Sequence, residues 1–338
     1  LDAIGDEGNG TFGRVVALGS VGKLLPSALV VGRAAHASDS FRGFSAAAMA
    51  GALAAELEWS PELTERTGNE LGSGPTLLGM KDSKTAYDVT TPASVWIYWN
   101  VATHRRSPDE VLNVVAHAAR QSGAALTARL GERAAQSEAV VSLGEIAIFR
   151  FETLLAEITT ADPEHGHRIA ALAEELAQGG TDLPEQCRAI TELAWELSGR
   201  CGPAIILGFA SIPYLPVTLG QDAASRRLEQ AVFDAAASVA GLFSTTISTI
   251  RYFPGISDVS FFGQADAGSV EAIAANTPAW RSVLAEAARF GAAGLPSINA
   301  GPWGRDYHTR LERIHIGYGF RVLPVLLREI VMRVLAPK

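Results

Sequence analysis

The sequence predicts an α/β or α+β fold for this chain. Short apolar runs that are rich in β-branched residues alternate with longer segments whose apolar residues have helical spacing. No internal repeat or low-complexity segment interrupts this alternation. Strands that alternate with helices are typical of a sheet covered by helices, and we take α/β as the fold class.

The predicted strands are short and punctuated by glycine. Residues 13–18 and 24–31 form two aliphatic runs near the start of the chain, and residues 91–102 form a run that carries aromatic side chains. Residues 204–210 and 295–300 are two further predicted strands. Strand signals therefore extend along the whole chain.

Helices are predicted from apolar spacing and from capping residues. Ser107 can cap a helix, Pro108 suits its first position, and Glu110 completes a capping box, so a helix should run to about Leu130, before Gly131. The segment 145–199 reads as a helical elaboration of one domain, with helix starts at Asp162–Pro163 and at residues 183–185. The remaining predicted helices cover residues 44–59, 223–242, 278–291 and 321–335.

The amino-acid composition limits the classes of protein to which the chain can belong. The chain has 338 residues, of which 48% are hydrophobic and 19% charged, so it can bury a sizeable core in one large or two smaller domains. The net charge of −8 argues against nucleic acid or an anionic membrane as the main partner. No apolar run reaches the roughly 18–20 residues that a membrane span needs.

The two cysteines and the first residues suggest a context. Cys187 and Cys201 are too few for a disulfide framework, so we expect two free, partly buried thiols and a cytoplasmic location. No signal peptide is visible. The chain opens with Leu1 rather than Met, and we interpret it as part of a longer polypeptide.

Most of the seven histidines are interpreted as structural or solvent-facing. His104 stands beside two arginines, where an exposed basic turn is preferred over an anion site. His315 follows His308 by seven residues and can share a face with it, although a structural role is preferred. The same interpretation applies to His117, His165 and His167.

His36 and His308 are the two candidate functional histidines. His36 lies in GRAAHASDSFRG, directly after a predicted strand, where a loop on a rigid scaffold can carry a reactive group. His308 ends the run NAGPWGRDYH, in which Gly301 and Gly304 permit tight turns and Asp306 can orient the ring. Spacing alone leaves the functional and structural readings of both open.

Other chemistries lack their motifs. The sequence has no GxSxG elbow, no phosphate loop with GK[ST], no HExxH and no cysteine–histidine metal spacing. An unrelated α/β hydrolase would therefore need a nucleophile that the sequence does not show.

Four runs carry a resemblance that spans nearly the whole chain. They are LGSVGKLLPSALVVGRAAHASDSFRG, KDSKTAYDVTTPASVWIYWNVATHRRSPDEVL, RYFPGISDVSFF and INAGPWGRDYHTRLERI. Together they resemble the aminoacylase/glutamate-carboxypeptidase family of zinc metallopeptidases, and within it the bacterial arginine-utilisation proteins, the RocB class. The second and fourth runs are the most specific.

The resemblance implies a fold and an activity. It implies part of a zinc-peptidase α/β catalytic domain (residues 1–22 and 244–338) with an inserted, enlarged α+β lid domain of the dimerisation type (residues 23–243). The expected activity is metal-dependent hydrolysis of an amide or peptide bond in a small amino-acid derivative, in the setting of arginine utilisation. About two zinc ions would bind each full-length chain. The expected partners are this substrate and a second copy held through the lid, and neither nucleic acid nor a membrane.

The resemblance also assigns metal and catalytic residues. His308 matches the C-terminal metal-ligand histidine. Asp2 matches the carboxylate ligand that precedes the lid, with Asp6 and Glu7 close enough to be alternatives. His36 matches the lid histidine that helps to hold the substrate carbonyl and the developing oxyanion, often across a dimer.

Substrate-binding residues follow from the same comparison. Ser257 and Asp258 match the turn that lines the substrate pocket, and Gly301 and Glu312 flank the metal histidine. The strand around Asn100 lacks the arginine that many relatives use for a substrate carboxylate. Arg251 is a candidate substitute, together with His104, Arg105 and Arg106.

The chain departs from the family in what it lacks. The early HxD motif, the bridging aspartate and the Glu–Glu pair are absent from the sequence, and we expect them to precede Leu1 in the full-length protein. Without them this chain alone should be inactive. The alternative is a catalytically inactive fragment, or a binding or assembly module, that retains a remnant site.

Overall fold

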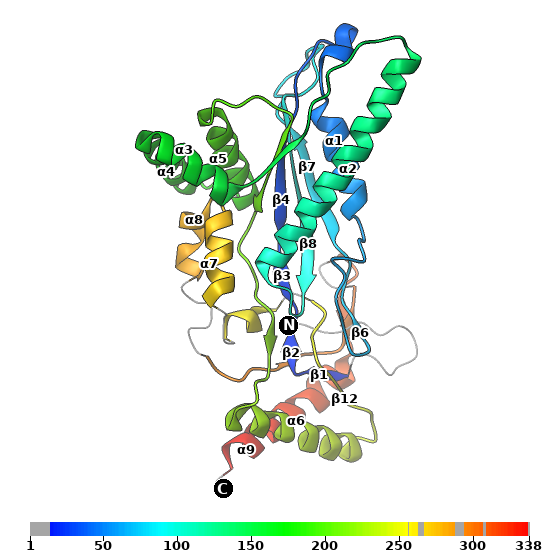
Figure 1. Ribbon diagram of the computed structural model, residues 1–338. Helices are drawn as coiled ribbons and strands as arrows, with labels where there is room; N and C mark the ends of the chain where they lie inside the picture. Colours follow the sequence, from blue (N-terminus) through cyan, green and yellow to red (C-terminus); the bar gives the residue numbers. More distant parts are fainter. Residues whose placement is uncertain (1–13, 256, 263–266, 288–293, 307–308, 337–338) are drawn as a thin grey trace.

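The computed structural model describes residues 14–255, 257–262, 267–287, 294–306 and 309–336 (Figure 1). It confirms the predicted α/β class, because helices and strands alternate and the strands form sheets covered by helices. The molecule is elongated. Figure 1 shows a large upper body around one long sheet and a smaller lower body that contains the C-terminal helix.

The upper sheet is mostly antiparallel. β7 pairs with β8, β8 pairs with both β3 and β4, and β4 pairs with β10, while β9 joins β10 in parallel. β3 and β4 lie on the same side of β8, with Lys23 opposite Ala102 and Leu29 opposite Trp96. The strands are β3 (Gly22–Leu24), β4 (Pro26–Val31), β7 (Thr76–Asp82), β8 (Ser94–Thr103), β9 (Ala147–Arg150) and β10 (Ala204–Phe209).

Helices cover both faces of this sheet. Because side chains alternate along a strand, Ala28 and Val30 of β4 join one core while Leu29 and Val31 join the other. The first core lies under α1 (Ala46–Leu57) and α2 (Pro108–Gln136). The second core lies under α3 (Phe151–Ala161), α4 (Pro163–Gln178) and α5 (Leu183–Leu197).

The lower body has its own core. A three-stranded sheet places β1 (Val15–Ala17) between a parallel β12 (Ser248–Ile250) and an antiparallel β13 (Asn299–Ala300). Val16 packs into a cluster formed with α6 (Ala223–Leu242) and α9 (Leu323–Leu335). The boundaries 1–22, 23–243 and 244–338 stay a prediction, although α6, which that division assigns to the lid, shares its core with α9.

Several chain segments pass between the upper and lower bodies, and two of them, residues 18–21 and 250–253, lie side by side; we call these the first and second crossings. Backbone hydrogen bonds tie them together, with Leu18 N donating to Ile250 O (2.9 Å) and Val21 N donating to Phe253 O (3.1 Å). β2 (Gly19–Ser20) pairs with β11 (Val217–Thr218) beside them. α7 (Ala267–Asn276) and α8 (Trp280–Ala287) follow the second crossing and pack against α2 and α4.

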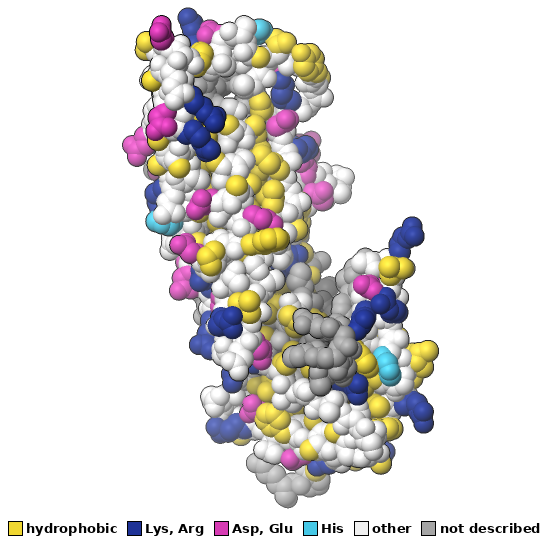
Figure 2. Space-filling model, turned by 90° about the vertical axis from the view of Figure 1, so that its right-hand side faces the viewer, with side chains coloured by type: hydrophobic (Ala, Val, Ile, Leu, Met, Phe, Trp, Pro, Cys, Tyr) yellow, Lys and Arg dark blue, Asp and Glu magenta, His cyan; other side chains and the backbone are white. Residues whose placement is uncertain are grey.

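Short elements complete the described chain. These are η1 (Ala37–Arg42), β5 (Arg66–Thr67), β6 (Glu70–Leu71), η2 (Asp258–Phe261), β14 (Gly304–Arg305), β15 (Arg313–Ile314) and a π-helical turn η3 (Tyr318–Val322) before α9. Figure 2 shows that hydrophobic side chains form a strip along the upper body and gather again on the lower body of the face it presents.

Local sequence signals account for several boundaries. The predicted capping box is confirmed, since Glu110 N donates to Ser107 Oγ (3.3 Å) and Ser107 N donates to Glu110 Oε2 (2.7 Å). α2 continues past Gly131 to Gln136, because a single glycine weakens a helix without ending it. The strand predicted over 295–300 is limited to Asn299–Ala300, since Pro296 has no N–H for a ladder.

Both cysteines are free thiols, as predicted, but their exposure differs. Cys187 is completely buried in α5, where burial raises its pKa to about 12. Cys201 is exposed rather than partly buried, because it lies in the turn between α5 and β10. Among the described residues, no helix combines the length and the apolar character that a membrane crossing requires.

Candidate functional site

His36 lies on an exposed loop at the far end of the upper body. It is the N-cap of η1, the short helix at the top of Figure 1. The loop is held by Ala37 N donating to Val89 O (2.8 Å) and by Thr91 N donating to Ala35 O (2.9 Å). The His36 backbone is therefore fixed, while its side chain faces solvent.

The hydrogen bonds of His36 determine which ring nitrogen can donate a hydrogen bond to a ligand. Ser38 N donates to Nδ1 (3.2 Å), and Ser38 Oγ lies 2.7 Å from the same nitrogen. Because a backbone N–H can only donate, Nδ1 is an acceptor, and the proton of the neutral ring must be on Nε2. The exposed edge of the ring thus presents an N–H donor to whatever approaches the loop.

Ser257 and the strand that precedes Gly301 are brought together in the lower part of the molecule. Ser257 is buried, and its Oγ accepts from Asn299 Nδ2 (3.0 Å) and from Val259 N (3.4 Å). This contact joins the 252–258 turn to β13, directly before Gly301. Asp258 begins η2, and its side chain lies outside the described residues.

Arg251 occupies the second chain crossing, six residues before Ser257. Its backbone N–H donates to Glu70 Oε1 (2.6 Å), whereas its guanidinium is exposed and has no hydrogen bond or ion pair with any described residue. A free cation at this position is suited to an anionic group of a ligand.

The predicted metal ligands His308 and Asp2 lie outside the described residues, as do Asp6 and Glu7. The part of the chain that the structure describes contains no group of three His, Cys, Asp or Glu residues placed to hold a metal ion. Asp306, predicted to orient His308, forms an ion pair with Arg313 across the β14–β15 hairpin. Its carboxylate therefore already has a partner.

His36 and the lower group of residues are not brought together within one chain. Figure 1 places η1 at one end of the molecule and α9, which follows the β14–β15 hairpin, at the other. A site that uses His36 together with Ser257 or Gly301 would need a second copy of the chain.

His104 is buried, and the expectation of an exposed basic turn is wrong. Only 4% of the residue is exposed, its ring stacks on Tyr252 with centroids 4.4 Å apart, and Nδ1 lies 3.0 Å from Thr67 Oγ1. Burial lowers the pKa of His104 below its ordinary value. The ring is covered because the β5–β6 hairpin and the second chain crossing both fold onto it.

Two carboxylates that the sequence did not single out complete this contact. Glu70 accepts from Arg251 N (2.6 Å) and Tyr252 N (2.9 Å). Glu65 accepts from Arg105 N (3.0 Å) and Arg106 N (3.2 Å). We call Glu65, Thr67, Glu70, His104 and Tyr252 the junction clamp, because they join the upper body to the second crossing.

The one local feature of the sequence that points to the junction clamp is the turn at Gly68. Gly68 has φ +61°, in the left-handed region that favours glycine, and it connects the two short strands that carry Thr67 and Glu70. Such a turn predicts a hairpin, and it contains no information about the distant backbone that Glu70 contacts.

The remaining predicted residues have identifiable surroundings. His315 stacks on Trp303 with centroids 4.5 Å apart and accepts from Tyr318 N (3.0 Å), a structural arrangement. His117 and His167 are exposed, and His165 is partly buried on α4. Arg105 and Arg106 line a cavity of about 250 Å³ at the end of β8.

Comparisons with known proteins identify similar chains. Protein RocB of Bacillus subtilis is 27% identical over 335 residues, which cover 95% of this chain and 58% of RocB. The uncharacterized protein YqjN of Bacillus subtilis is 27% identical over 318 residues, which cover 91% of this chain and 57% of YqjN. No family model matches the sequence.

Among solved structures, a tripeptidase from Staphylococcus aureus aligns with a TM-score of 0.45 and 15% identity, covering 95% of this chain and 53% of that one. An M20 family metallo-carboxypeptidase from Sulfolobus solfataricus aligns with a TM-score of 0.41 and 10% identity, covering 95% and 60%. The resemblance to the RocB class is confirmed by the two curated relatives: the chain is similar to them over nearly its whole length and spans somewhat more than half of theirs.

Proposed function

We propose that the full-length protein is a metal-dependent amidohydrolase or peptidase-like hydrolase that cleaves an amide or peptide bond of a small amino-acid derivative. The similarity to RocB over 95% of the chain supports this proposal. The observation that carries it is the arrangement at His36, where Ser38 saturates Nδ1 and leaves Nε2–H exposed on a fixed loop.

That arrangement is suited to the chemistry of amide hydrolysis. When a nucleophile adds to an amide carbonyl, negative charge develops on the oxygen. A donor that is already oriented stabilises this charge without reorganising, and removing such a donor costs about 10²–10³ in turnover in other hydrolases. Ser38 holds the ring in the required tautomer, and the 83–93 loop holds the backbone that carries it.

We propose that the full-length protein binds zinc. Imidazole and carboxylate are normal zinc donors, so His308 and Asp2 would hold part of the site. When bound, the metal would supply an activated water and polarise the carbonyl. Arg251, whose guanidinium has no partner among the described residues, would pair with a carboxylate of the substrate, as expected for an amino-acid derivative. Arginine utilisation and a cytoplasmic location stay predictions.

We propose further that His36 acts on a second copy of the chain, in a homodimer formed through the upper body. β7 is an edge strand, since it pairs with β8 alone among the described strands, and Leu78 (52%) and Met80 (45%) on it are exposed. An open edge with exposed apolar side chains is suited to strand pairing. The loop after β7 contacts the His36 loop, so pairing at this edge would carry His36 toward the partner.

Metal content and hydrolysis test the enzyme proposal. We expect about two zinc ions per full-length chain, with metal content and hydrolysis both reduced in the His308→Ala variant. A full-length protein that binds no zinc, and keeps its activity after His308→Ala, would refute the proposal.

The second candidate is a binding or assembly module without catalysis. It is favoured by the sequence, which lacks the HxD motif, the bridging aspartate and the Glu–Glu pair of the family. It predicts that metal content and hydrolysis of the full-length protein are the same with and without His308.

The molecular mass of the Met80→Lys variant in solution tests the proposed dimer independently. A shift to monomer supports pairing at β7, and an unchanged mass contradicts it.

A further inference from the structure

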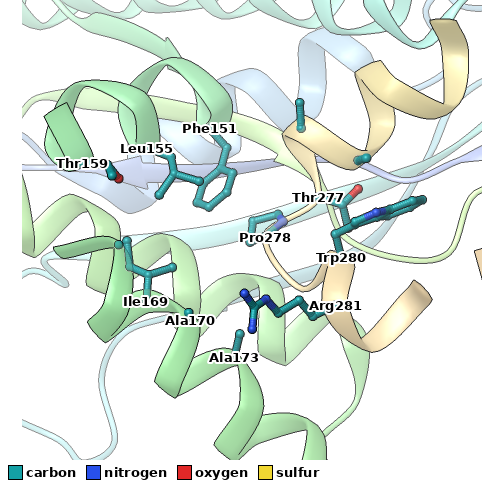
Figure 3. Close-up of a pocket in the computed structure, with 13 residues that line it drawn as sticks. Phe151, Leu155, Thr159, Ile169, Ala170, Ala173, Thr277, Pro278, Trp280 and Arg281 are labelled. Carbon is teal, nitrogen blue, oxygen red and sulfur yellow. The ribbon is translucent and has the colours of Figure 1, made fainter. Parts of the chain in front are cut away.

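A cavity lies between the inserted helices and the chain that follows the second crossing. It has a volume of about 320 Å³, toward the lower end of the roughly 300–1,000 Å³ typical of small-molecule sites. α3 and α4 form one side, and the connection between α7 and α8 forms the other (Figure 3). None of the described residues assigned to the hydrolase lines it.

The lining is almost entirely apolar. Phe151 and Leu155 of α3 and Ile169 of α4 face Pro278 across the cavity in Figure 3. Small side chains on α4, notably Ala170 and Ala173, leave room between these larger groups. An apolar body of a ligand would lose water contact here without leaving polar groups unsatisfied.

Arg281 is the one cation among the described residues that line this cavity. Figure 3 shows Arg281 reaching from α8 toward Ala173 of α4. The guanidinium has no hydrogen bond or ion pair with any described residue, and no acid is among the described residues that line the cavity. An arginine with all its donors available binds a carboxylate through two parallel hydrogen bonds.

The occupant follows from these two features. We propose that this cavity binds a small carboxylate with an apolar body, its aliphatic or aromatic part against Phe151 and Ile169 and its carboxylate on Arg281. The hydroxyl of Thr277 does not compete for the carboxylate, because it donates to Ile273 O (2.7 Å). A bound acid would connect the inserted helices α3 and α4 to the segment that returns toward the lower body.

Calorimetric titration of the purified protein tests the site. The probes are 3-phenylpropanoate and its neutral counterpart 3-phenylpropan-1-ol, which share the apolar body and differ in charge. We expect the acid to bind about tenfold more tightly than the alcohol, because only the acid forms charge-assisted hydrogen bonds with Arg281. Equal affinities, or no binding of either probe at millimolar concentration, would overturn the proposal.

Two variants and a control assign the binding to this cavity. Arg281→Gln should abolish the preference for the acid, and Ala170→Leu should remove binding of both probes by filling the cavity. Arg168→Gln, on the exposed face of α4 outside the lining, should behave as the unmodified protein. An undiminished preference for the acid in Arg281→Gln would contradict the assignment, and circular dichroism confirms that each variant is folded.

Discussion

The loop at the far end of the upper body and the junction clamp each hold one histidine, and the two rings differ in how much of each is exposed to solvent. At His36 the protein contacts one nitrogen and leaves the other edge of the ring exposed. At His104 it covers a ring face with Tyr252, bonds Nδ1 to Thr67, and leaves 4% of the residue exposed. Both rings are oriented by their neighbours, but only His36 presents a donor to a ligand.

The difference in exposure indicates whether each histidine contributes to stability or to the reaction. Burial of His104 beside Glu70, which holds two backbone N–H groups, joins two bodies of the same chain and should contribute to stability. His36 makes few contacts that folding requires, so its removal should affect the reaction alone. Variants at the two histidines therefore distinguish a catalytic role from a structural one.

Replacing His36 should have the largest effect, and it should fall on catalysis. In the full-length protein, His36→Ala should lower turnover about 10²-fold, because the carbonyl oxygen loses an oriented donor. Metal content and the free energy of unfolding should not change. Steady-state kinetics and elemental analysis measure this, with His167→Ala, another exposed histidine, as the control. A loss of metal in His36→Ala would make His36 a ligand.

Replacing His104 should lower stability instead. His104→Ala should reduce the free energy of unfolding by about 2 kcal/mol, since it removes the stack on Tyr252 and leaves the buried Thr67 hydroxyl without its partner. Urea denaturation measures the change. His117→Ala, at an exposed position of α2, is the matched control and should stay within about 0.5 kcal/mol. Equal effects of the two variants would mean that the clamp contributes nothing to stability.

The pH dependence of stability should reveal the same burial. The pKa of His104 is lowered in the folded protein, so the unfolded chain binds more protons between that pKa and the ordinary value of about 6.5. The contribution of the neutral ring is therefore complete above about pH 6.5 and decreases as the pH falls toward the folded pKa. We expect the stability difference between unmodified protein and His104→Ala to shrink over this window. A difference that stays constant with pH contradicts the prediction.

The smallest expected effect concerns the support of His36. Ser38→Ala removes the hydroxyl and keeps the backbone N–H that donates to Nδ1, so turnover should fall about fivefold, the equivalent of one neutral hydrogen bond. KM should be unchanged, because ring orientation matters most when charge develops. Ser40→Ala on the same short helix is the control. A loss as large as that of His36→Ala would assign Ser38 a direct role.

Local signals predicted the fold well where the structure depends on local contacts. The capping box at Ser107 and the helix over 223–242 depend on residues within one or two turns, and both occur as predicted. His36 was found as a candidate because its loop directly follows a strand. The strand over residues 76–82 was missed, since its apolar side chains alternate weakly and Gly79 interrupts the run.

Contacts between distant segments account for what the sequence did not predict. His104 is covered by Thr67, 37 residues away, and by Tyr252, which belongs to the other chain crossing. Two arginines beside His104 favoured an exposed turn in the sequence, whereas their backbone N–H groups are held by Glu65. No local pattern encodes these contacts, and the cavity beside Arg281 likewise depends on helices that are far apart in sequence.

Mixing two impaired variants of the full-length protein tests most directly whether His36 acts in the site of a second copy. His36→Ala and His308→Ala chains, combined and allowed to exchange subunits, would form hybrids with one intact site. We expect about a quarter of the unmodified activity to return, because half of a random mixture is hybrid and each hybrid restores one site of two. If subunits exchange and no activity returns, His36 does not act across the dimer, and the central claim fails.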